Sequence, residues 1–277
     1  MEIPPGPPTS HIFKFCREKY TMKIGASTFY GISNKSVLES VKELERKGFQ
    51  TIELMYEFNN LIKQEEIIQL KKKKLDLSMH CPFIGTMFTH LNPSFSLPQI
   101  KLIEKSLKVA CKLKCSHYVM HGGKIPFAYS VIENPKNKEF FTKLFIKRFK
   151  NIFKKYSTKG VKILIENMVS PKDIGGQIED IKLIQKSIPE VGFCFDIAHS
   201  EVSNQTNQII KDLKIDYVHA TDNNLKMDLH MTIGKGKINY KNIIKKIKNK
   251  GFNGKIILEN SSFEECVESR NNLRKII

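Results

Sequence analysis

The chain of 277 residues lacks any apolar run approaching the roughly 20 residues that a membrane-spanning helix needs. It also lacks, near residue 1, the basic stretch followed by an apolar stretch that marks a secretory signal. Its six cysteines are irregularly spaced, which is not typical of a disulfide framework in a chain of this length. We therefore predict a cytoplasmic protein that works without a membrane.

Acidic residues are scarce beside basic ones, because 28 Asp and Glu face 46 Lys and Arg and give a formal net charge of +18. A basic surface attracts nucleic acid, and it attracts small phosphorylated molecules as well. Many lysines lie in helix-like stretches such as residues 71–74, and a general compositional bias toward Lys explains the charge equally well. The net charge is therefore compatible with either DNA or a phosphorylated substrate as the partner.

Regular structure is not expected before residue 22, since four of the first eight residues are prolines. We predict a flexible N-terminal extension over residues 1–21. Residues 22–277 contain no stretch with the composition of a linker, so we predict that they form one domain. That length suits a (β/α)₈ barrel, which needs about 250 residues.

From residue 22 onward, short apolar runs alternate with amphipathic stretches of helical periodicity. The runs are rich in Ile, Val, Leu and Phe, as expected for strands buried on both faces. They span residues 22–27, 51–55, 75–80, 117–121, 162–166, 192–196, 216–220 and 255–259. The predicted helices span residues 34–47, 96–113, 138–158, 177–186, 204–213, 240–250 and 263–276.

Eight strands that alternate with helices predict parallel βαβ units closing into a single-domain (β/α)₈ TIM barrel. An open doubly wound sheet is the alternative, but no glycine-rich phosphate turn follows the first strand. We expect a long loop over residues 81–98, and loops of that length in compact domains are usually functional. The Phe residues between 140 and 153 recur at helical spacing and are predicted to lie in the core.

Six consecutive predicted strands, the third to the eighth, end in or carry His, Glu or Asp. In a TIM barrel these side chains would gather at the mouth where active sites lie. Clustered buried carboxylates are costly unless a cation compensates them, and His, Asp and Glu are usual ligands of Zn, Mn and Co. The pattern predicts a divalent-metal site built from His80, His121, Glu166, Asp196, His219 and Glu259, with His199, Asp228 and His230 from the following loops.

Four of these residues come from four successive strands and can surround one ion while leaving positions open for substrate. They are Glu166, Asp196, His219 and Glu259. The remaining side chains have three roles open to them: binding substrate, supporting the ligands, or binding further metals. Lys124 is a candidate for binding a substrate phosphate, with a solvated loop lysine as the alternative.

At these residues the sequence resembles the xylose isomerase-like TIM barrel superfamily. The superfamily includes sugar phosphate isomerases and epimerases, and the endonuclease IV family. The resemblance spans nearly the whole chain from residue 22. It is carried by Ile165-Glu166-Asn167, Asp196-Ile-Ala-His199, His219-Ala-Thr-Asp222 and Asp228-Leu-His230-Met-Thr-Ile-Gly234-Lys-Gly236.

The isomerase branch implies one Zn, Mn or Co ion held by Glu166, Asp196, His219 and Glu259. Glu166 and Glu259 would then pass a proton on a sugar or sugar phosphate through an enediolate. His199 would bind a substrate hydroxyl, and His80, His121, His230 and Lys124 are further substrate-binding candidates. The stretches Lys-Ile-Gly-Ala-Ser-Thr at 23–28 and Thr-Ile-Glu-Leu at 51–54 look like this branch, although many such isomerases have Arg in place of His230.

The endonuclease IV branch implies up to three zinc ions and cleavage of DNA 5′ to an abasic site. Its ligands would be His80, His121, Glu166, Asp196, His199, His219, Asp228, His230 and Glu259, and every one is present. The chain departs from that branch at Ser27-Thr-Phe-Tyr-Gly31, where His-Ser is usual, and at Phe83, where Tyr is usual. We favour the isomerase or epimerase, keep the nuclease as the alternative, and place a noncatalytic metal-binding barrel third.

Overall fold

The structure, a computed structural model, describes residues 22–57, 60–126, 129 and 135–277. The predicted N-terminal extension over residues 1–21 lies outside the described residues. Within the described part of the chain, no helix has the length and apolar character needed to cross a membrane.

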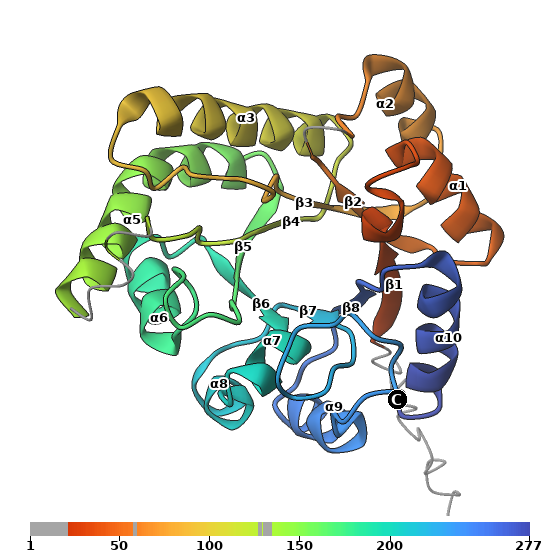
Figure 1. The fold of residues 1–277 in the computed structure, drawn as a ribbon. Coiled ribbons are helices and arrows are strands. Elements are labelled where there is room, and N and C mark those ends of the chain that lie inside the picture. The colour runs from red at the N-terminus through yellow and green to blue at the C-terminus, as the bar shows by residue number, and fades with distance from the viewer. Residues whose placement is uncertain (1–21, 58–59, 127–128, 130–134) are drawn as a thin grey trace, which may run out of the picture.

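Eight parallel strands form a closed barrel in chain order, and the helices surround it (Figure 1). The first strand closes the ring, because it pairs with the second strand on one side and with the eighth on the other. The predicted TIM barrel is confirmed, and the open doubly wound sheet is excluded. The strands are β1 (Lys23–Ser27), β2 (Thr51–Met55), β3 (Asp76–His80), β4 (His117–Met120), β5 (Lys162–Glu166), β6 (Gly192–Asp196), β7 (Tyr217–Ala220) and β8 (Lys255–Leu258).

The helices of the described residues follow the strands around the ring. They are the 3-10 helix η1 (Thr28–Gly31), α1 (Val37–Arg46), α2 (Gln64–Lys71), α3 (Pro93–Lys112), α5 (Pro135–Ser157), α6 (Ile178–Ser187), α7 (Ile197–Val202), α8 (Thr206–Asp212), α9 (Tyr240–Asn249) and α10 (Phe263–Arg274). Every predicted strand is present with ends that agree within one residue. The helix predictions were less accurate.

The start predicted at residue 96 for the helix over 96–113 was wrong, because α3 begins at Pro93. Asn92 caps α3 by accepting the backbone N–H of Ser94 at 2.9 Å, and Pro93 occupies the first turn, where its missing N–H costs nothing. Pro98 lies in the second turn, where it removes one backbone hydrogen bond without ending the helix. The loop predicted over residues 81–98 therefore ends at Asn92.

Two short helices, α2 and α7, were not predicted from the sequence. Helix α2 has only three apolar positions among its eight residues, which is too few for a clear helical stripe. Helix α7 begins directly after β6, because the Asp196 carboxylate accepts the backbone N–H of His199 at 2.6 Å. The helix predicted over residues 204–213 is shortened to α8, since α7 and a turn precede it.

Two apolar cores hold the barrel together. A small cluster of five residues is separate from the main core and is drawn from strands β4 to β8: Val119, Leu164, Cys194, Tyr217 and Ile257. The larger cluster includes the residues between the strands and the helices. In α5 the core prediction is confirmed for Phe141, Phe145, Phe149 and Phe153, which are fully buried. It was wrong for Phe140, which is off their helical spacing and is 52% exposed.

Replacing Phe149 by Ala is expected to lower the free energy of unfolding by about 3–5 kcal/mol, because the change leaves a cavity in the core. The Phe149 ring packs against Phe145, Phe153 and Phe88, with ring centroids 5.0 to 5.4 Å apart. Denaturant unfolding monitored by circular dichroism measures the loss. Phe140→Ala on the same helix is the matched control, since Phe140 is 52% exposed and its loss should change stability by less than about 0.5 kcal/mol.

Candidate metal centre

The four predicted ligands of a single ion converge at the carboxyl ends of β5 to β8. Glu166, Asp196, His219 and Glu259 each present a ligand atom, and these atoms all lie within 4.8 Å of one another. Nδ1 of His219 lies 3.1 Å from a Glu166 oxygen and 3.4 Å from a Glu259 oxygen. All four residues are buried, with at most 7% of their surface exposed.

The charge of this quartet fits a cation. Three carboxylates share one buried space, and their ion-pair partners in the described part of the chain are histidines. Buried carboxylates without a compensating charge are costly. A divalent ion supplies that charge, and carboxylate oxygens with imidazole nitrogen are suitable donors for Zn, Mn or Co.

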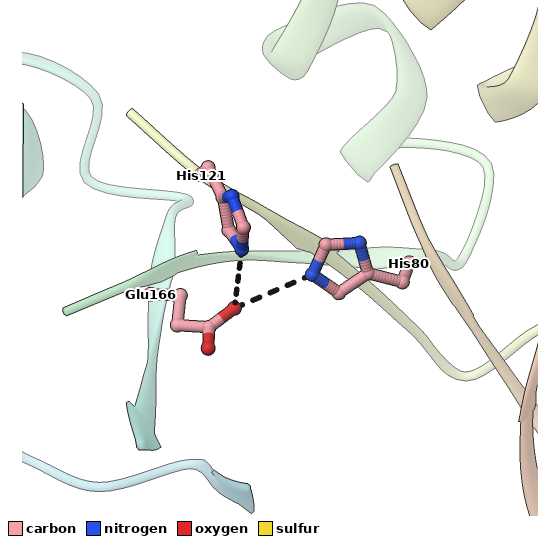
Figure 2. Close-up of side chains that lie close together, drawn as sticks. All are labelled: His80, His121 and Glu166. Carbon is pink, nitrogen blue, oxygen red and sulfur yellow. Dashed lines mark hydrogen bonds and ion pairs between the residues drawn. The ribbon is translucent and has the colours of Figure 1, made fainter. Parts of the chain in front are cut away.

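Two further predicted residues meet the quartet at Glu166. Figure 2 shows His80 and His121 pointing at one carboxylate oxygen of Glu166, with Nε2 distances of 3.4 and 3.3 Å. The three side chains form a second group whose ligand atoms all lie within 4.8 Å. Glu166 therefore belongs to both groups. One of its carboxylate oxygens faces His80 and His121, and the other faces His219.

A third group surrounds Asp228, in the loop after β7. Nε2 of His199 and Nε2 of His230 lie 3.2 and 3.0 Å from the same Asp228 oxygen. The opposite nitrogens are also occupied, since Nδ1 of His199 lies 2.8 Å from the Asn167 carbonyl and Nδ1 of His230 lies 2.6 Å from the Glu259 carbonyl. Backbone carbonyls thus orient both rings toward Asp228.

The asparagines that follow the two glutamates hold neighbouring loops in place. After β5, the Asn167 side chain donates to the Asp196 carbonyl at 2.9 Å and accepts the Asp196 N–H at 2.8 Å. After β8, Asn260 donates to the carbonyls of His230 and Met231, at 3.2 and 2.8 Å. Neither asparagine was predicted to be a site residue, and the available signal was that a Glu-Asn pair occurs at the ends of both β5 and β8.

The carboxyl groups of the quartet differ in acidity. Burial, aided by Glu166 and Glu53, raises the pKa of Glu259 to about 7, and burial raises the pKa of Asp196 to about 6. Burial also opposes the ionisation of Glu166, but His219 and His121 outweigh it and hold the pKa of that carboxyl well below its usual range. Glu166 is therefore ionised at neutral pH, while Glu259 carries a proton part of the time.

Affinity for a divalent metal is expected to fall as the pH drops from about 8 to about 6, because Glu259 and Asp196 must lose their protons to bind a cation. Titration of Mn²⁺ or Zn²⁺ by calorimetry across this range measures the effect. Two buffers of different ionisation enthalpy count the protons that metal binding releases. Equal affinity at both ends of the range, with no proton release, would contradict the proposed ligands.

Glu53 is a buried member of the site that sequence reasoning missed. It lies in the middle of β2, is fully buried, and its carboxylate lies 3.2 Å from Nε2 of His219. A charged residue inside an apolar strand was the available signal. The prediction considered only residues at strand ends, and so it passed over this position.

A cavity of about 900 Å³ opens above the predicted site residues. The buried residues His80, Glu166 and Glu259 form its floor, and the apolar residues Phe29, Phe83 and Met87 also line it. The Phe29 ring stacks on His230 with centroids 5.0 Å apart. Lys124 lines the cavity with an exposed side chain, so the structure brings it to the opening and not to the quartet.

Comparisons with known proteins agree with this architecture. MJ1311 from Methanocaldococcus jannaschii is 26% identical over 269 residues, which cover 92% of this chain and 89% of that protein. A protein named probable endonuclease 4, from Sulfurihydrogenibium sp., is 26% identical over 198 residues, covering 62% of this chain and 68% of its own. A solved structure described as a D-tagatose 3-epimerase-like protein superposes with a TM-score of 0.82 at 25% identity, covering 92% of this chain and 97% of that one.

A family model also matches the chain. Its description is xylose isomerase-like TIM barrel, and the match covers residues 41–276. That range contains strands β2 to β8 and all of the predicted metal ligands. The chain therefore belongs to the xylose isomerase-like TIM barrel family.

Proposed function

We propose that the chain is a divalent-metal-dependent isomerase or epimerase that acts on a sugar or sugar phosphate. The observation that carries the proposal is the convergence of Glu166 and Glu259, from two strands that are not neighbours in the barrel, on Nδ1 of His219. Two carboxylates beside one cation are a suitable pair for taking a proton from a carbon and returning it. The likeness to a D-tagatose 3-epimerase-like structure supports the same class of reaction.

A divalent cation bound by the quartet would polarise the carbonyl of the substrate and stabilise the negative charge that develops on it. Glu166 and Glu259, on either side of Nδ1 of His219, are suited to accept the proton from the carbon next to the carbonyl and to return one. His199 lines the cavity and would donate its Nε2–H to a substrate hydroxyl where that hydroxyl replaces the Asp228 carboxylate, which lies 3.2 Å from Nε2.

The cavity is suited to a polyhydroxylated substrate that carries a phosphate at the end far from the metal site. Its polar floor offers imidazole and carboxylate partners for hydroxyl groups, and Phe29 offers an apolar face for the C–H side of a sugar ring. Lys124 and Lys172 at the lining provide positive charge for a phosphate at the far end of the substrate. Both free sugars and sugar phosphates therefore belong in the first screen.

The test is exchange with solvent. The metal-loaded protein is incubated in D₂O with ketoses, aldoses and their phosphates, and deuterium at the carbon next to the carbonyl is followed by NMR. Exchange reports the proton transfer even where the two sugars are equally stable. Deuterium incorporation that a chelator abolishes would support the proposal, and no exchange with any member of the screen would count against it.

The second candidate is a zinc-dependent endonuclease that cleaves DNA 5′ to an abasic site. The observation that favours it is the presence of the two further groups, His80–His121–Glu166 and His199–Asp228–His230, beside the quartet. The likeness to a probable endonuclease 4 points the same way. The test is nicking of a DNA duplex that carries one abasic site. If a chelator abolishes that nicking and no sugar incorporates deuterium, the nuclease becomes the proposed function in place of the isomerase.

A further inference from the structure

Below the quartet, a chain of polar side chains continues into the barrel. The Ser78 hydroxyl lies 2.6 Å from the Tyr217 hydroxyl, which donates to the Glu53 carboxylate at 2.9 Å. The same carboxylate lies 3.2 Å from Nε2 of His219 through one oxygen and 3.3 Å through the other. All four side chains are fully buried.

This arrangement is costly for the fold alone. A carboxylate with no exposed surface loses its hydration, and in the described part of the chain its ion-pair partner is His219. Other strands of the barrel contribute buried apolar side chains, such as Val119 of β4, Leu164 of β5 and Ile257 of β8. An apolar residue at position 53 would serve packing at least as well, so packing does not account for the charge.

The two nitrogens of His219 face different partners. Nδ1 points toward Glu166 and Glu259, at 3.1 and 3.4 Å, while Nε2 points toward Glu53. An imidazole that binds a metal through one nitrogen usually donates the other N–H to a carboxylate or carbonyl, which fixes the ring and its tautomer. The position of Glu53 matches that of such an acceptor.

We infer that Glu53 is a positioning residue: its carboxylate accepts the Nε2–H of His219 and so presents an unprotonated Nδ1 to the cation of the quartet. Tyr217, itself held by Ser78, fixes the carboxylate in turn. Glu53 acts through His219 and does not touch the substrate. The inference rests on the metal site of the proposed function, but it does not depend on which substrate is turned over.

The experiment measures Zn²⁺ affinity by competition with a chromogenic chelator. Glu53→Gln keeps the shape of the side chain and removes its charge, and it should weaken Zn²⁺ binding by about 10–100-fold. Glu66→Gln is the matched control, because Glu66 is also a buried carboxylate but lies on α2, where it accepts the backbone N–H of Lys63 at 2.9 Å. The control should bind Zn²⁺ within about threefold of the unchanged protein.

A spectroscopic measurement separates positioning from a general loss of structure. In the zinc-loaded unchanged protein, ¹⁵N NMR of the histidine rings should show a proton on Nε2 of His219, shifted downfield and protected from exchange by the carboxylate. In Glu53→Gln that signal should move upfield and exchange faster. This spectrum of the unchanged protein tests the inference even where the variant does not fold.

The outcomes are distinct. Weaker zinc binding by Glu53→Gln with the shifted ring signal supports the inference. Equal zinc affinity in both proteins overturns it while leaving the proposed enzyme intact. A His219 proton on Nδ1 in the zinc-loaded form overturns it and also removes His219 from the proposed metal ligands. Failure of the unchanged protein to bind zinc would overturn the metal site and this inference together.

Discussion

Glu259→Gln is expected to lower the rate of solvent exchange by a factor of about 10² to 10⁴, the range that one acid–base group contributes. The amide cannot carry the proton that the Glu259 carboxyl holds, and it is also a poorer ligand for a cation. The overall fold should persist, because Gln has almost the same shape and β8 remains paired with β1 and β7. Deuterium exchange and circular dichroism measure the two effects.

The control is Glu264→Gln, which makes the same chemical change at an exposed position in the first turn of α10. Its exchange rate should equal that of the unchanged protein. Normal turnover by Glu259→Gln, measured with saturating metal, would remove Glu259 from the proposed chemistry. A loss of metal with no loss of rate per bound metal would assign Glu259 to metal binding alone.

Glu166→Gln is expected to produce the largest loss of metal, at least about 100-fold in affinity, because substitution even of residues that only support a ligand costs 10–100-fold. Glu166 is the carboxylate shared by the quartet and by the group with His80 and His121. The substitution therefore affects both groups at once. Metal content per protein after dialysis, measured by elemental analysis, gives the result.

His121→Gln is the matched comparison, since it touches only one of the two groups. It should leave the metal of the quartet in place. If Glu166→Gln and His121→Gln lose the same amount of metal, the ion lies on the His80–His121 side and the quartet is not the primary site. If Glu166→Gln retains its metal, neither group is the binding site.

The fold could be predicted because the strands of a parallel barrel are buried on both faces and therefore stand out as apolar runs. Residues 162–166 and 192–196 are such runs, and the structure has them as β5 and β6. Helix starts were harder, because they depend on one capping contact. The Asn92 cap and the acceptance of the His199 N–H by Asp196 are visible only once the backbone is folded.

The site was predictable where a residue stands at the end of a strand, because the barrel brings all such ends to one mouth. His80, Glu166 and Asp196 illustrate this rule. Glu53 and Asn167 could not be assigned in the same way. The contacts of Glu53 and Asn167 join different strands. Such contacts depend on which side chains face the barrel axis and on the length of each side chain, and neither follows from the position of a residue in a strand.

The pairing of β1 with β8 has a consequence for how the protein is made. Strand β1 must wait until β8 has been synthesised before its free edge is paired, because Ile24 pairs with Ile256. Contacts between such distant parts of a chain slow folding, and an unpaired strand edge favours aggregation. Chains released before β8 are therefore expected to be cleared or to aggregate, and a chaperone that shields the edge of β1 would raise the yield of closed barrels.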